Sequence, residues 1–77
     1  MSYGYSLKLI ENNRDANIAS LGVQLGRQCI EHGVPVSKVA RDLGVTRQSV
    51  YNWFCGVTAP QDELVGLIRE YIANLPR

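Results

Sequence analysis

The chain has 77 residues, enough for one domain around one small core. Hydrophobic residues make up 45% of it, which argues against a chain that is disordered throughout. Eight Lys and Arg residues face seven Asp and Glu residues, and the resulting net charge of +1 is a weak signature for nucleic-acid binding.

The apolar runs are only a few residues long, which excludes a transmembrane span and a membrane partner. The first residues, MSYGYSLKLIENN, lack the basic and then apolar plan of a secretory signal. We therefore expect a cytoplasmic protein.

No constellation of residues predicts catalysis or metal binding. Cys29 and Cys55 fall in predicted helices without a CxxC or Cys/His pattern, so we expect free thiols and disfavour a disulfide. His32 is the only histidine and has no zinc ligand set around it. Because a Ser/His/Asp set, paired carboxylates in a plausible cleft and a phosphate loop are all missing, we expect no enzyme, no cofactor and no small-molecule ligand.

Residues 1–12 are ambiguous. Apolar and other residues alternate here with the period of a strand, and the alternating residues are Tyr3, Tyr5, Leu7 and Leu9. A lone strand is unstable, so it would need a partner such as the same strand of a second subunit. We favour an extended or strand-like N-terminal arm. The alternatives are a short helix capped by Ser6 that carries Leu7 and Ile10, and a disordered segment.

One long helix is predicted from about Asn13 to His32, ended by Gly33. Its inward stripe, at spacings of three and four, is Ile18, Leu21, Leu25 and Cys29, with Ile30 as a further candidate beside it. Gly22 and Gly26 lie one turn apart beside that stripe. Each costs up to about 1 kcal/mol relative to alanine in a helix interior, so we expect another helix to use the space.

Two short helices around a tight turn follow. Pro35 suits the first turn of the first helix, and Gly44 suits a left-handed residue that ends it. Thr46 is a good N-cap for the second helix. The apolar positions of the pair are Val39, Ala40, Leu43, Val50, Trp53 and Phe54.

The last helix is predicted after a loop in which Thr58 and Gln61 are spaced as a capping box. Its large apolar positions are Leu64, Leu67, Ile68, Tyr71, Ile72 and Leu75. These exceed what three small helices comfortably cover. The edge formed by Tyr71, Ile72 and Leu75 is therefore either a dimer surface or is covered by the first helix, and the sequence leaves both open.

The run from Val36 to Gly56, VSKVARDLGVTRQSVYNWFCG, resembles the Cro/repressor-type (XRE-like) helix-turn-helix DNA-binding proteins of phages and bacteria. The residues that carry the resemblance are Ala40, Gly44, Val45, Val50, Trp53 and Gly56. The resemblance implies an all-α fold of four helices, with a helix-turn-helix DNA-binding domain over 13–75 behind the arm at 1–12. It also implies that Cys29 and Phe54 lie near one another, where well-known members hold an ion pair.

The resemblance further implies a recognition helix over 46–55 that enters the major groove. The implied base-contacting residues are Arg47, Gln48, Ser49 and Asn52. Their chemistry agrees, because Arg forks onto guanine while Gln and Asn fork onto adenine; the alternative is a solvated polar face. The candidates for phosphate contact are Ser37, Lys38, Arg41 and Tyr51.

We therefore expect a repressor-like transcription regulator that binds double-stranded DNA as a homodimer in a bacterial host cell. Its two recognition helices would be roughly 34 Å apart. Near-neutral charge and the apolar last helix leave an alternative open. The same unit would then serve protein–protein interaction, phage assembly or an accessory DNA transaction.

Overall fold

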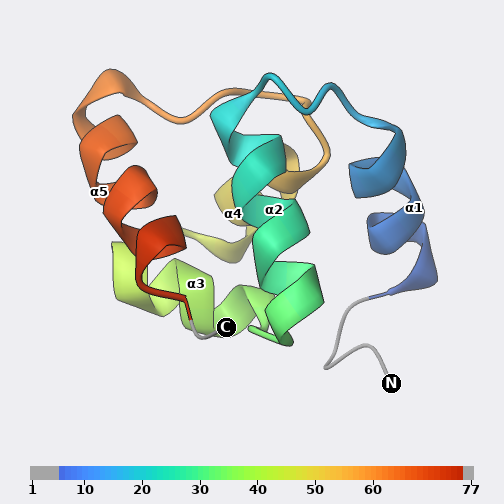
Figure 1. The fold of residues 1–77 in the computed structure, drawn as a ribbon, viewed down its shortest axis with the longest axis horizontal. Coiled ribbons are helices and arrows are strands. Elements are labelled where there is room, and N and C mark those ends of the chain that lie inside the picture. Colours follow the sequence, from blue (N-terminus) through green and yellow to red (C-terminus); the bar gives the residue numbers. More distant parts are fainter. Residues whose placement is uncertain (1–5, 76–77) are drawn as a thin grey trace.

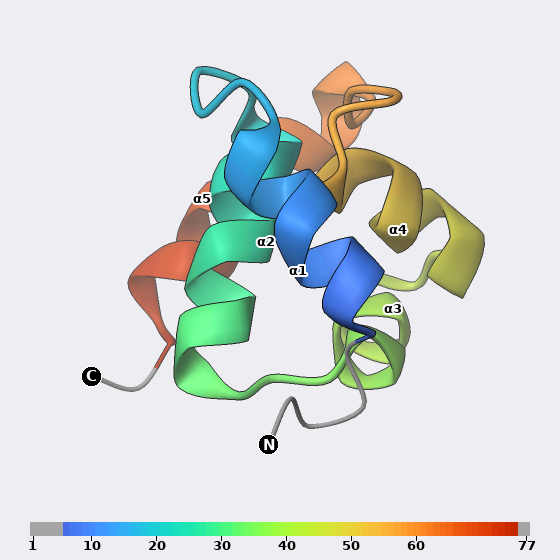
Figure 2. The ribbon, with the colours of Figure 1, turned by 90° about the vertical axis from the view of Figure 1, so that its right-hand side faces the viewer.

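Every regular element in the described residues, 6–75, is an α-helix in the computed structural model, so the predicted all-α class is confirmed. The five helices there are α1 (Leu7–Asp15), α2 (Leu21–His32), α3 (Val36–Leu43), α4 (Arg47–Phe54) and α5 (Asp62–Ala73). Helix α2 runs through the middle, with α1 on one side and α5 on the other (Figure 1). Helices α3 and α4 lie together on the right in Figure 2, with α4 above α3. None of these helices is long and apolar enough to cross a membrane.

Helix α1 corrects the expectation of an extended arm over residues 1–12. The hydroxyl of Ser6 accepts the N–H of Leu9 at 3.1 Å, so the alternative of a helix capped by Ser6 is the one observed. In a strand, Leu7 and Leu9 would lie on the same face. In the structure Leu9 is 3% exposed and Leu7 is 71% exposed, so the alternating pattern does not mark one buried face. The part of the predicted arm at residues 1–5 lies outside the described residues.

The predicted helix from Asn13 to His32 is two helices separated by a turn. Helix α1 ends at Asp15, and Ala16 is extended. Asn17 stabilises the turn that follows, because its side-chain oxygen accepts the N–H of Ala19 at 3.0 Å, an alternative to helical bonding that asparagine favours. Ile18 lies in this turn, is 47% exposed and does not belong to the inward stripe. The expected total of four helices is therefore too low for the described part of the chain.

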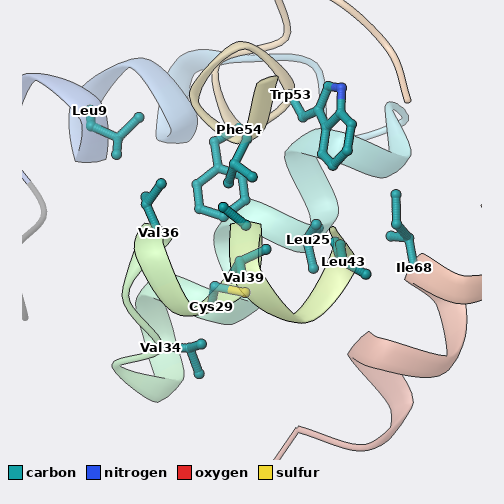
Figure 3. Close-up of a cluster of buried hydrophobic side chains, with 12 residues drawn as sticks. Leu9, Leu25, Cys29, Val34, Val36, Val39, Leu43, Trp53, Phe54 and Ile68 are labelled. Atoms are coloured by element: carbon teal, nitrogen blue, oxygen red, sulfur yellow. The ribbon is translucent and has the colours of Figure 1, made fainter. Parts of the chain in front are cut away.

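The core lies between α2, α3 and α4, with one leucine from α1 and one isoleucine from α5 at its ends (Figure 3). Its buried members are Leu9, Leu25, Cys29, Val34, Val36, Val39, Ala40, Leu43, Val50, Trp53, Phe54 and Ile68. Cys29 and Phe54, the predicted neighbours, are both fully buried in this one cluster. Burial raises the pKa of the Cys29 thiol to about 12 and keeps it protonated.

The two glycines of α2, Gly22 and Gly26, allow α4 to pack closely against it. A Cβ on Gly22 would lie 2.7 Å from the Cβ of Trp53, and a Cβ on Gly26 would lie 2.7 Å from the Cγ of Phe54. Both distances are far inside van der Waals contact, so only glycine allows α4 to approach this closely. The prediction that another helix uses this space is confirmed.

Helix α5 is attached more loosely. Ile68 is its one fully buried residue, Leu67 is 47% exposed, and the remaining large apolar residues are partly covered. Its N-cap is Gln61, so the predicted capping box at Thr58 is not formed. Two hollows flank its C-terminal end. One, of about 220 Å³, is lined by Val34, Lys38, Asp42, Tyr71, Asn74 and Leu75. The other, of about 500 Å³, is lined by Gln28, His32, Ile72, Ala73 and Leu75.

Candidate nucleic-acid interface

The turn between α3 and α4 is built by two local devices that the sequence predicts. Gly44 has φ of 70° and ends α3 in the left-handed region, and the N–H of Val45 reaches back to the carbonyl of Ala40 at 3.0 Å. Thr46 then begins α4, because its hydroxyl oxygen accepts the N–H of Ser49 at 3.1 Å. The short connection places the N-terminal end of α4 at the surface, beyond α3 (Figure 2).

Helix α4 has one buried and one open face. Val50, Trp53 and Phe54 are buried and attach it to the body of the protein. The four residues predicted to face bases are brought together on the rest of its surface, with Arg47 and Gln48 exposed and Ser49 and Asn52 half-exposed. These four side chains are therefore available to a partner.

Three of the four side chains already have polar side-chain partners on α4 or at its N-cap. Gln48 donates from Nε2 to Asn52 Oδ1 at 3.0 Å. The hydroxyl of Ser49 lies 3.0 Å from that of Thr46, which ties Ser49 to the N-cap. The side chain of Arg47 makes no hydrogen bond or ion pair with another described residue, so its guanidinium is the least constrained group on this face.

The candidates for phosphate contact are not equivalent. Lys38 donates to Asp42 Oδ2 at 2.8 Å, and the hydroxyl of Tyr71 donates to the same oxygen at 2.8 Å. These two hydrogen bonds, the one from Lys38 first, lower the pKa of the Asp42 carboxyl. Burial, and then the bond to Asp42, raises the pKa of Tyr71. Lys38 is thus directed toward the end of α5.

The other three candidates are placed differently. Ser37 and Arg41 are exposed on α3. Tyr51 is half-buried and packs against the core, so only its hydroxyl group could make a polar contact with a phosphate. Of the cations in α3 and α4, Arg41 and Arg47 are therefore the ones not bonded to a carboxylate in the described residues.

On its buried side, α4 is also held by a hydrogen bond from a residue that the sequence did not single out for this role. Asn13 is 2% exposed, and its Nδ2 donates to the carbonyl of Phe54 at 2.7 Å and to that of Val23 at 3.2 Å. Arg27 on α2 donates to the carbonyls of Asn13 and Arg14 at 3.0 Å each. The available signal was the spacing of Asn13 from Leu9, four residues apart on the buried side of α1.

Comparisons with protein-family models, curated proteins and solved structures find no match to this chain. Its function is therefore inferred from its own residues and their geometry.

Proposed function

We propose that this chain is a sequence-specific DNA-binding transcription regulator in which α3 and α4 form a helix-turn-helix. The observation that carries the proposal is the division of α4 into a buried face and an open face. The buried face fixes the helix, and the open face presents Arg47, Gln48, Ser49 and Asn52. An α-helix fits the major groove, where these side-chain types pair with base edges.

In this proposal α4 enters the groove with its N-terminal end leading, and α3 lies across the backbone. Arg47 then forks onto a guanine, and the exposed Arg41 and Ser37 of α3 contact phosphates. Lys38 contributes less than the sequence suggested, because Asp42 offsets its charge at 2.8 Å. A single copy then offers few phosphate contacts and modest affinity.

Modest affinity per copy favours binding as a homodimer. Two copies would double the contacts and place two recognition helices in successive major grooves, roughly 34 Å apart. The half-exposed edge of α5 that contains Tyr71 and Ile72 is one surface available for pairing. Bound at a promoter, such a dimer would repress transcription by occupying the DNA.

The test is selection of binding sites from a random DNA library, followed by affinity measurements on Arg47→Ala and Arg69→Ala. Both variants remove one exposed Arg, on α4 and on α5 respectively, so their effect on net charge is the same. Arg47→Ala should weaken specific binding by about tenfold or more and relax one base position. Arg69→Ala should change affinity far less. Equal losses in the two variants would leave only non-specific charge attraction and contradict base readout.

A second candidate function is a helix-turn-helix module that binds another protein. The near-balanced charge and the partly covered apolar residues of α5 favour it. Titration of the wild-type chain with random duplex at low salt separates the two, because non-specific DNA binding is strongest there. If no binding is detected under those conditions, the DNA-binding proposal is wrong and the protein-binding candidate replaces it.

A further inference from the structure

Two amide side chains on α4 are bonded to each other. Gln48 Nε2 donates to Asn52 Oδ1 at 3.0 Å, and the two residues lie one turn apart on the open face of the helix. A primary amide has two N–H groups and one carbonyl oxygen. Because one N–H of Gln48 is donated to Asn52, Gln48 offers a partner one N–H and one carbonyl oxygen.

We infer that Asn52 is a positioning residue that makes Gln48 accept adenine and reject guanine. The inference rests on the proposed function. In the major groove adenine shows one acceptor, N7, and one donor, the N6 amino group, whereas guanine shows two acceptors, N7 and O6. The bonded Gln48 matches adenine with its N–H and its carbonyl. Against guanine it lacks the second N–H, and its carbonyl oxygen meets O6.

A free glutamine would discriminate less. With both N–H groups available, its amide can turn to offer donors to N7 and O6 of guanine as well as a donor and an acceptor to adenine. The bond to Asn52 removes this choice before DNA arrives. On the exposed surface such a bond contributes little stability, because water competes for both groups. In a groove from which water is displaced, the same bond becomes stronger.

The positions of the two residues on α4 agree with this division of roles. Gln48 is the second residue of the helix, and the leading end of a recognition helix is the part that reaches base edges. Asn52 lies one turn further along, is less exposed, and already uses its side-chain oxygen as an acceptor. Asn52 therefore acts through Gln48, instead of contacting a base pair itself as the family resemblance implies.

The experiment uses the full wild-type chain and duplexes built on its selected site. At the base pair that Gln48→Ala relaxes, the affinity ratio of adenine to guanine is measured for wild type, Asn52→Ala and Asn52→Asp. The ratio should fall by about tenfold in Asn52→Ala. Asn52→Asp keeps an acceptor for Gln48 Nε2, so it should keep the ratio while weakening all binding through its added negative charge.

Two further variants sharpen the result. The double variant Gln48→Ala with Asn52→Ala should show the same ratio as Gln48→Ala alone, because residues that act through one contact are not additive. Asn12→Ala removes an exposed amide from α1 and should leave the ratio unchanged. Circular dichroism of the helices checks that each variant is folded. If Asn52→Ala does not fold, the adenine-to-guanine affinity ratio of Asn52→Asp alone tests the inference.

Three outcomes would overturn the inference. If Asn52→Ala relaxes a different base pair from Gln48→Ala, Asn52 is itself a base reader. If the site carries guanine where Gln48 acts, the two amides have exchanged donor and acceptor roles. If Asn52→Asp loses the ratio as fully as Asn52→Ala, the acceptor is not what matters. All three leave the proposed function intact, whereas a wild-type chain without any sequence preference would refute the proposed function first.

Discussion

The contact between α2 and α4 differs sharply from the attachment of the C-terminal end of α5. At the α2–α4 contact, Gly22 and Gly26 leave no room for even one added carbon. On α5, the one buried residue is Ile68, and two hollows flank the C-terminal end of the helix. The helix that carries the candidate interface is therefore fixed tightly, and the helix with the partly covered apolar edge is not. Tight packing favours a recognition surface of one defined shape.

The largest effect is expected from Gly26→Ala, which attacks the tight contact directly. The new Cβ would lie 2.6 Å from Asn13 Nδ2 and 2.7 Å from Phe54 Cγ, both buried groups that have little space to move. We expect a loss of about 3 kcal/mol in the free energy of unfolding, since overpacking outweighs the better helix propensity of alanine. Urea denaturation followed by circular dichroism measures it.

The matched control is Gly66→Ala on the loosely attached helix. Because nothing lies within 4 Å of its Cβ position, only the helix propensity changes, and we expect a gain of about 0.5–1 kcal/mol. Destabilisation by both substitutions, to the same degree, would remove the contrast between the two regions.

A smaller loss is expected from Asn13→Ala, which removes the bonds behind α4. The variant loses the donors to the carbonyls of Phe54 and Val23 in a buried site, and the expected cost is about 2 kcal/mol in unfolding free energy. Asn12→Ala, at an exposed neighbour, should cost far less. Amide hydrogen exchange adds a local measurement, and faster exchange in α4 than in α5 is expected. Uniform acceleration through all helices would indicate a global effect only.

The smallest effect is expected from Tyr71→Phe, which removes the hydroxyl bonded to Asp42. The folded protein lowers the pKa of Asp42, so this carboxylate contributes stability above its unfolded pKa of about 4, and the contribution is lost as pH falls through the folded pKa. The difference between wild type and Tyr71→Phe should therefore be present at neutral pH and shrink in acid. Thermal melts between pH 3 and pH 7 measure it. A difference that is constant over this range would mean that the bond to Asp42 does not stabilise α5.

The parts of the fold that the sequence predicts are those fixed by local signals. Gly44 and Thr46 define the α3–α4 turn within a few residues, and the spacing of three and four marks the buried side of α4. Helix α1 was misjudged, because its cap at Ser6 competed with an alternating pattern that long-range packing alone resolves. Asn17 was missed because Ile18 happened to continue the helical period across the turn.

The candidate interface shows the same limit. The grouping of Arg47, Gln48, Ser49 and Asn52 on one face follows from helical spacing and was predictable. The support from Asn13 was not, because its partner Phe54 is 41 positions away along the chain. The orientation of Lys38 depends in part on Tyr71, which lies on the last helix and donates to the same carboxylate oxygen. Tertiary partners of this kind leave no periodic trace in a single sequence.

The bonds made by Arg27 have a consequence for how the first helix could change. Arg27 donates to the main-chain oxygens of residues 13 and 14, and every amino acid carries such an oxygen. Arg27 on α2 thus holds α1 through main-chain atoms, and the side chain at position 14 can be replaced without removing these hydrogen bonds. The side chains by which α1 itself contacts the body are few: Leu9 and Asn13 are buried, and Ile10 packs against the core.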